Sequence, residues 1–253
     1  MNYWNICFSP VGGTSKCSHM LLEGMTSSYK ELDLCDPKLD YAKLNFTEDD
    51  IVVFALPSYG GLVPELALNR LDCFHGLHTR CILLVVYGNR AYEDTIVQLQ
   101  DKVTENGFTV VGACAAIAEH SIAHKIAAGR PDASDIEKLQ QFGKKIAEKI
   151  ASNNITTPDI PGNRPYRAPS SFSMIPHVAS KCNKCGLCAS KCPAESINND
   201  DPTITDHSRC ISCMRCITLC PNQARVLNPV KLAACTAMLK SKAGTRKEPE
   251  LFM

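Results

Sequence analysis

The sequence predicts a doubly wound α/β domain with a five-stranded parallel sheet, followed by a small α+β domain. Apolar, β-rich segments alternate with helical segments up to about residue 152, which is typical of a parallel sheet covered by helices on both faces. Beyond that point come a proline-rich stretch and two closely similar cysteine motifs. We therefore divide the chain into a sheet domain (1–152), a linker (153–177), a cysteine-rich domain (178–228) and a C-terminal helix with a docking tail (229–253).

Nine segments of the sheet domain have the composition of strands or helices. The strands are predicted over 3–9, 29–35, 50–57, 80–87 and 108–118, and the helices over 14–26, 64–73, 92–106 and 134–151. Ligands of such sheets bind at the carboxyl ends of the strands, near the point where the strand order reverses. The loops that follow the strands are therefore where we expect a binding site.

The loop after the first strand, SPVGGTSK, has the composition of a phosphate-binding turn. Glycines let the backbone approach a ligand closely, while hydroxyls and the free N–H groups of the following helix suit an anion. The spacing is not that of a Walker loop, and G-x-G-x-x-G does not occur. By itself, an ordinary tight turn explains the loop as well. The candidate binding residues are Ser9, Val11, Gly12, Gly13, Thr14 and Ser15.

Two further loops, PSYGGLVP and YGNRAYED, follow the third and fourth predicted strands. Each combines an aromatic side chain with residues that permit backbone contact, which suits a flat heteroaromatic ring. Either loop alone could be ordinary surface, but a phosphate loop followed by two ring loops predicts a flavin site. The candidate residues are Pro57, Ser58, Tyr59, Gly60 and Gly61 in one loop and Gly88, Asn89, Arg90 and Tyr92 in the other.

Eight of the 15 cysteines lie in CNKCGLCASKCP (182–193) and CISCMRCITLCP (210–221), which share the spacing C-x2-C-x2-C-x3-C-P. In such runs three cysteines hold one iron-sulfur cluster and the fourth holds the other. Zinc is the alternative metal, but it prefers separated pairs or mixed Cys/His sets. The remaining seven cysteines are expected to be buried thiols in a reducing compartment. We expect one [4Fe-4S] cluster on Cys182, Cys185, Cys188 and Cys220, and a second on Cys210, Cys213, Cys216 and Cys192.

Two further features each allow two interpretations. Residues 119–135 form a larger connection than a strand-to-helix turn needs, so we expect a lid or a seat for the cysteine-rich domain, with a structural excursion as the alternative. Basic side chains outnumber acidic ones between residues 178 and 228, which we interpret as solvated surface charge, with a docking face as the alternative. These basic residues are Lys181, Lys184, Lys191, Arg209, Arg215 and Arg225.

Taken together, these motifs resemble the flavodoxin-ferredoxin fusion proteins of anaerobic bacteria and archaea, known as EFR-type ferredoxins. The resemblance rests on FSPVGGTSK, PSYGGLVP, VYGNRAYED, AEHSIAHKIAAGRPDASD and the doubled cysteine motif, which is similar to that of bacterial two-cluster ferredoxins. It implies FMN in a flavodoxin-like domain and two [4Fe-4S] clusters in a bacterial-type ferredoxin domain. The first loop departs from the flavodoxin pattern S/T-x-T-G-x-T at Val11, where a hydroxyl is lost.

The function we expect is electron transfer between the clusters and FMN, with a low-potential redox protein as donor or acceptor. A flavin-dependent oxidoreductase acting on a quinone, a metabolite or dioxygen is one alternative, and a redox-sensing binding module is another. No nucleophile with a matched base stands out, so no catalytic residue is assigned.

Composition narrows the partners and the location of the protein. Lys and Arg (27) nearly cancel Asp and Glu (26) over 253 residues, so neither a nucleic-acid partner nor a polybasic membrane anchor is expected. No apolar run reaches the roughly 18 residues of a membrane span, and no secretory signal is evident. We predict a cytoplasmic protein with no membrane span; a homo-oligomer is left open.

Overall fold

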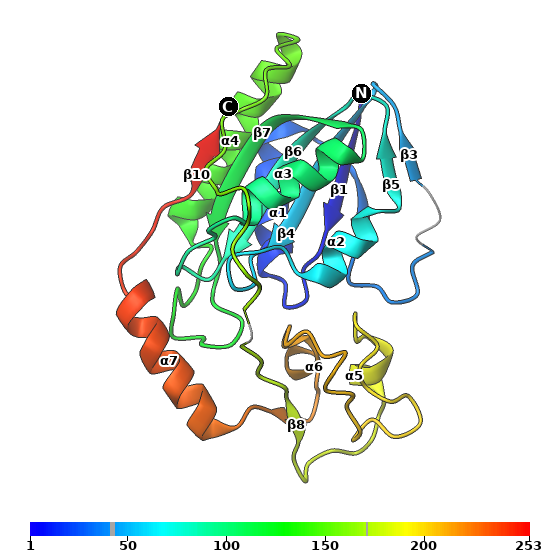
Figure 1. Ribbon diagram of the computed structural model, residues 1–253, viewed down its shortest axis with the longest axis vertical. Helices are drawn as coiled ribbons and strands as arrows, with labels where there is room; N and C mark the ends of the chain where they lie inside the picture. Colours follow the sequence, from blue (N-terminus) through cyan, green and yellow to red (C-terminus); the bar gives the residue numbers. More distant parts are fainter. Residues whose placement is uncertain (41–43, 171) are drawn as a thin grey trace.

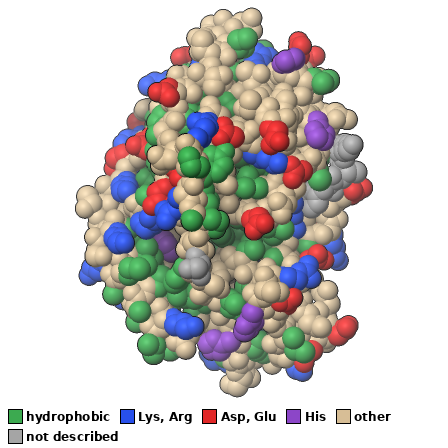
Figure 2. Space-filling model, in the orientation of Figure 1, with side chains coloured by type: hydrophobic (Ala, Val, Ile, Leu, Met, Phe, Trp, Pro, Cys, Tyr) green, Lys and Arg blue, Asp and Glu red, His purple; other side chains and the backbone are tan. Residues whose placement is uncertain are grey.

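The computed structural model describes residues 1–40, 44–170 and 172–253. Residues 41–43 of the predicted sheet domain and residue 171 of the predicted linker therefore lie outside the described residues. Figure 1 shows two bodies, with the sheet domain above and the cysteine-rich domain below, and helix α7 running from the lower body toward the edge of the sheet. Figure 2 shows acidic and basic side chains interspersed over the visible face, in line with a net charge of +1.

Five parallel strands form the central sheet in the order β2-β1-β4-β6-β7. Strand β4 is buried along its whole length, as expected for a central strand with helices on both sides. Among the five parallel strands the order along the chain is 2-1-3-4-5, which is that of the flavodoxin-like doubly wound fold. The predicted fold class is confirmed. The strand bounds are Asn2–Cys7 (β1), Lys30–Asp33 (β2), Asp50–Pro57 (β4), Thr79–Tyr87 (β6) and Phe108–Ile117 (β7).

Two helices cover each face of this sheet, and their apolar sides form its two cores. Helices α2 and α3 pack on one face, and α1 and α4 on the other. Glycine allows α1 and α4 to cross closely, because a Cβ on Gly24 or Gly143 would lie 2.1 Å from a backbone oxygen of the other helix. The helix bounds are Gly13–Met25 (α1), Glu65–Leu71 (α2), Thr95–Glu105 (α3) and Ala133–Ala151 (α4).

A sixth strand, β10 (Glu250–Phe252), pairs antiparallel with β7 at the sheet edge. The sequence predicted that the apolar tail docks on the protein, but not that it extends the sheet. Leu251 and Phe252 point to opposite faces and pack on the two cores, as successive residues of a strand must. The chain therefore leaves the sheet domain after α4 and returns to it at the C-terminus.

The cysteine-rich domain consists of short elements. Strands β8 (His177–Val178) and β9 (Arg225–Val226) pair antiparallel, and helical turns α5 (Leu187–Ser190) and α6 (Arg215–Thr218) lie between them along the chain. Helix α7 (Pro229–Ala243) follows. Strands β3 (Leu44–Phe46) and β5 (Phe74–Gly76) form a second small sheet beside the main one. None of the helices in the described ranges has the length and apolar character needed to cross a bilayer.

The linker is fixed along helix α3 by two aspartates. The carboxylate of Asp94 accepts hydrogen bonds from the backbone N–H and the side-chain Nδ2 of Asn163, both at 2.9 Å, and from the Arg167 N–H at 2.8 Å. Two turns of the helix further along, Arg164 forms an ion pair with Asp101. The predicted linker is thus attached to the sheet domain at both points.

Candidate functional site

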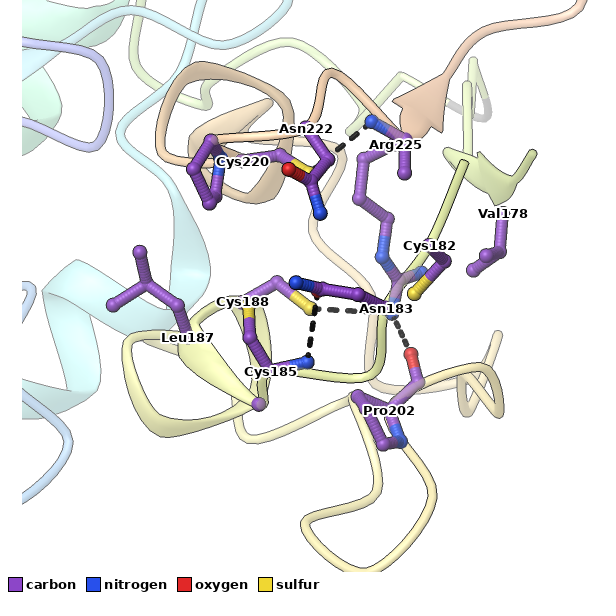
Figure 3. A pocket seen from close by; sticks show the side chains of 13 residues that line it. Val178, Cys182, Asn183, Cys185, Leu187, Cys188, Pro202, Cys220, Asn222 and Arg225 are labelled. Carbon is purple, nitrogen blue, oxygen red and sulfur yellow. Dashed lines mark hydrogen bonds between the residues drawn. The ribbon is translucent and has the colours of Figure 1, made fainter. Parts of the chain in front are cut away.

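The first three cysteines of one motif and the last cysteine of the other line a common cavity of about 340 Å³. Figure 3 shows Cys182, Cys185 and Cys188 on one side of this space and Cys220 on the other. We call it the outer cavity, because Cys185 is exposed and the other three thiols are half-buried.

The other four motif cysteines line a second cavity of about 380 Å³, which we call the inner cavity. Cys210, Cys213 and Cys216 of the second motif meet Cys192 of the first there, and two of the four are fully buried. The two cavities group the cysteines in the crossed sets that the spacing predicts. Within the described residues, no group of three His, Cys, Asp or Glu side chains is arranged to hold a single metal ion.

The backbone of the two motifs repeats its left-handed positions 28 residues apart. Gly186 and Met214 begin α5 and α6 with φ of 74° and 65°, and Lys184 and Ser212 precede them with φ of 58° and 53°. These positions turn the chain sharply, so that three cysteines of each motif face one space. Met214 adopts a conformation that costs a residue with a side chain about 1–2 kcal/mol, which indicates that its side chain is needed where it lies.

Backbone amides point at several of the sulfurs. The N–H groups of Lys184 and Ala224 donate to Cys182 Sγ at 3.4 Å and to Cys220 Sγ at 3.2 Å. Burial raises the pKa of Cys220, but amides led by that of Ala224 outweigh it, so the pKa falls below its ordinary value. Amide donors of this kind stabilise thiolate ligands.

Burial opposes the deprotonation of two of the cysteines that line the inner cavity. Burial, the largest cause, raises the pKa of Cys213 to about 12 and that of Cys216 to about 12. These sulfurs would become thiolates at neutral pH only beside a strong positive centre, as metal ligands do. The donor set and its buried surroundings therefore fit a thiolate-ligated metal group.

The predicted phosphate loop lies between β1 and α1. Gly12 has φ of 90°, and a Cβ there would meet nothing within 4 Å, so open space adjoins the loop. The Ser9 hydroxyl accepts a hydrogen bond from the Ser15 N–H at 2.9 Å and so shapes the loop itself. Thr14 is 4% exposed, and no acidic residue lies in the first turn of α1, which leaves its positive end free for an anion.

The second loop is a tight turn in which Gly60 and Gly61 have φ of 62° and 91°. The Tyr59 N–H donates to the Leu62 carbonyl at 2.8 Å across the turn. The Ser58 hydroxyl is 2.7 Å from that of Thr95, so it bonds within the protein. Pro57 ends the buried strand β4. The linker passes over this turn, since a Cβ on Gly60 would lie 2.9 Å from Ser170.

Comparison with known proteins assigns the cysteine-rich part. A family model described as "4Fe-4S binding domain" matches residues 175–198 and 203–226, one match for each motif. The cysteine-rich domain is a 4Fe-4S ferredoxin domain. With the strand order above, the chain is a flavodoxin-like domain fused to this ferredoxin domain.

Solved structures similar to the chain include flavoproteins of several kinds. The flavodiiron core of Flv1 from Synechocystis has 15% identity and a TM-score of 0.43, over 61% of this chain and 37% of its own. Flavodoxin 1 of Bacillus cereus has 16% identity, a TM-score of 0.40 and coverage of 58% and 98%. An FMN-dependent NADH-azoreductase of Bacillus anthracis has 14% identity, a TM-score of 0.37 and coverage of 62% and 100%. No curated protein matches the chain.

The inner cavity of the ferredoxin domain lies against the flavodoxin-like domain. Burial raises the pKa of Tyr59 well above its ordinary value, and Cys213 adds to this effect from across the interface. Ile211, which lines the inner cavity, packs on the core of the sheet. Arg70 on α2 donates to the Pro193 carbonyl at 2.6 Å, and Pro193 also lines that cavity. The inner cavity and the predicted ring loop are therefore neighbours.

Arg215 joins the inner cavity to the phosphate loop. It lines the cavity, and its guanidinium donates to the carbonyls of Ser9 at 3.4 Å and Pro10 at 3.3 Å. It also lies 3.7 Å from Asp33, and its Nε is buried without a hydrogen-bond partner among the described residues. The prediction of solvated surface charge is wrong for Arg215, whose side chain is 17% exposed.

Val11 packs in an apolar cluster that joins the two domains. Met214 of the ferredoxin domain, Ala123 and Ile126 of the 119–135 connection, and residues of α7 form this interface cluster, and Val11 packs against it. This contact explains why an apolar side chain replaces a hydroxyl in the loop. Ala123 and Ile126 share this cluster with Met214, which supports the prediction that residues 119–135 form a seat for the ferredoxin domain.

The third loop bonds mainly to the C-terminal segment. The Asn89 side chain donates to the carbonyls of Ala243 at 2.7 Å and Thr245 at 2.9 Å. Tyr92 donates to Glu250 at 2.7 Å, and Arg90 pairs with Glu93 at 2.7 Å. These side chains are thus bonded within the protein. A flavin contact of Gly88, Asn89, Arg90 and Tyr92 stays a prediction, and His120 lies beside Gly88.

Two residues of the ferredoxin domain that line or join the site can be found by comparing the two halves of the repeat. Shifting by 28 residues pairs Gly186 with Met214 and Ile197 with Arg225. In each pair the two residues differ in type, and the second one has a contact of its own. Met214 packs in the interface cluster, and Arg225 is buried at 3% exposure. A comparison of the two motifs position by position is the sequence signal that identifies them.

Proposed function

We propose that the chain is an iron-sulfur flavoprotein that passes electrons between two [4Fe-4S] clusters and FMN. When bound, the clusters exchange single electrons and the flavin accepts one or two, so the pair can link one-electron carriers to two-electron chemistry. The contact of Arg215, which lines the inner cavity, with the phosphate loop of the same chain is the observation that carries this proposal.

The crossed cysteine sets would hold the clusters. Cys182, Cys185, Cys188 and Cys220 would ligate one in the outer cavity, and Cys192, Cys210, Cys213 and Cys216 the other in the inner cavity. The exposed Cys185 leaves the outer cavity within reach of a redox protein partner, whereas two of the four cysteines of the inner cavity are buried at the domain interface. The outer site is therefore the proposed entry point for electrons, and the inner site the one beside the flavin.

The flavin would lie across the strand ends of the flavodoxin-like domain. Its phosphate would fit at the N-terminus of α1, where Gly12 adjoins open space and the first-turn N–H groups of Gly13 and Thr14 lie, while the Ser15 N–H bonds to Ser9 Oγ. Arg215 would hold this loop in place through its carbonyls, with its positive charge close by. Tyr59 and the Gly60–Gly61 turn would contact the ring.

Stepwise anaerobic reduction tests the proposal. We expect purified protein to contain FMN and iron-sulfur clusters, and a reduced ferredoxin to reduce both sets of signals within one chain. Protein that binds no FMN after careful purification would contradict the proposed site. Steady turnover with NADH or NADPH and a quinone, a metabolite or dioxygen would instead favour a flavin-dependent oxidoreductase.

A further inference from the structure

Arg225 is a buried cation that lines both sulfur cavities. It lies on β9, its residue is 3% exposed, and among the described residues no carboxylate is within ion-pair distance of it. Figure 3 shows its side chain running down one side of the outer cavity, past Cys182. An arginine side chain remains charged at any relevant pH, so burial does not neutralise it.

Within the part of the chain that the structure describes, the hydrogen-bond partners of this guanidinium are uncharged or sulfur. It donates to Cys188 Sγ at 3.6 Å, to Thr205 Oγ1 at 2.9 Å and to the Pro202 carbonyl. A buried charge without a counter-charge is strongly destabilising, which is why such charges are paired in native proteins. The groups that would supply negative charge on both sides of Arg225 are the thiolate-ligated clusters of the two cavities.

The fold itself does not require a cation at this point. The equivalent position of the first motif is Ile197, which lines the inner cavity with an apolar side chain. Since the two motifs otherwise share their turns, an apolar residue is compatible with this backbone. The arginine therefore has a role other than folding the motif.

We propose that Arg225 is the shared counter-charge of the two clusters and raises both of their reduction potentials, that of the outer cluster more. This inference rests on the proposed function. Each cluster gains one negative charge on reduction, so a fixed cation in a region of low dielectric stabilises the reduced form more than the oxidised form. The larger effect falls on the outer cluster because Arg225 donates directly to its ligand Cys188.

The test is a redox titration of the whole protein, with the two clusters followed by electron paramagnetic resonance. In Arg225→Met we expect the ratio of oxidised to reduced outer cluster at a fixed potential to rise about tenfold, ~59 mV for one electron, with a smaller shift of the same sign for the inner cluster. Arg225→Lys keeps the charge and should shift both less. Lys181→Met removes an exposed cation beside Cys182 and should change neither, because water and salt screen it.

Each outcome decides the inference. Potentials in Arg225→Met equal to those in Lys181→Met, with both clusters present, would overturn it. If Arg225→Met assembles no clusters while Arg225→Lys does, the positive charge itself is required, which supports the proposal; failure of both variants would show a structural role and reject it. Wild-type protein without any [4Fe-4S] signal would instead refute the proposed function.

Discussion

Replacing Asp94 with asparagine should release the linker that holds the ferredoxin domain in place. The Asp94 carboxylate is 1% exposed and accepts three hydrogen bonds from the linker residues Asn163 and Arg167. An asparagine keeps the shape, but its neutral oxygen makes weaker bonds, and its NH2 group would face an N–H donor.

The expected magnitude follows from the number and type of these bonds. A hydrogen bond to a charged group contributes about 1.5–3 kcal/mol and a neutral one about 0.5–1.5 kcal/mol. Weakening two bonds costs about 2–3 kcal/mol and losing the third a further 1.5–3 kcal/mol, so the free energy of linker opening should fall by about 3.5–6 kcal/mol. At about 1.4 kcal/mol per factor of ten, the open population rises at least ~300-fold.

Limited trypsin digestion measures this opening at the peptide bond after Arg167. When opening is fast relative to cleavage, the cleavage rate follows the open population. Asp101→Asn is the matched control: its carboxylate also holds the linker but is 36% exposed, and an exposed ion pair contributes about 0–1 kcal/mol. Equal cleavage rates in Asp94→Asn and wild type, or a larger increase in Asp101→Asn, would refute the reasoning.

Further predictions concern pH, the clusters, the flavin loop and the interface. The hydrogen bond from the Arg167 N–H lowers the pKa of Asp94; burial opposes this shift and hydrogen bonds from Asn163 add to it. The attachment of the linker to Asp94 should therefore persist above the pKa that this carboxyl has in the unfolded chain, and be lost as the pH falls through its lower folded-state pKa. Proteolysis of the linker should become faster in acid. Cys192→Ser should remove the inner cluster signal and Cys220→Ser the outer one; the reverse pattern would reject crossed ligation. Because Gly12 has φ of 90°, an alanine there adds about 1–2 kcal/mol of backbone strain. Gly12→Ala should therefore weaken FMN binding roughly tenfold, measured by fluorescence titration. Met214→Gly relieves similar backbone strain but removes a side chain that packs in the interface cluster. The interface should loosen, so the clusters should reduce the flavin more slowly; an unchanged rate of flavin reduction would contradict this role of Met214.

Local patterns in the sequence were sufficient for the fold and for the crossed cysteine sets. Strand alternation and helix periodicity depend on neighbouring residues, and so do the turns that let three cysteines face one cavity. For this reason the α/β fold class is confirmed, and the cavities group the cysteines as their spacing predicts.

Side-chain partners distant in the sequence could not be predicted in this way. Asn89 is a predicted flavin contact because its loop follows a strand, and no local pattern indicates that its side-chain amide bonds to Ala243, 154 positions away. The sixth strand likewise depends on an open edge of β7 that only the folded sheet presents. Contacts of this range are decided by the packing of whole elements.

Residue spacing along the chain is enough to predict a flavodoxin-like sheet with glycine-rich loops at its strand ends, and a doubled cysteine motif of 4Fe-4S type. It does not indicate which sulfur cavity faces the sheet domain, or that Arg215 contacts the predicted phosphate loop while Arg225 is buried between the cavities. Spacing sets the local turns, whereas the burial of a charge depends on which surfaces meet when the two domains pack.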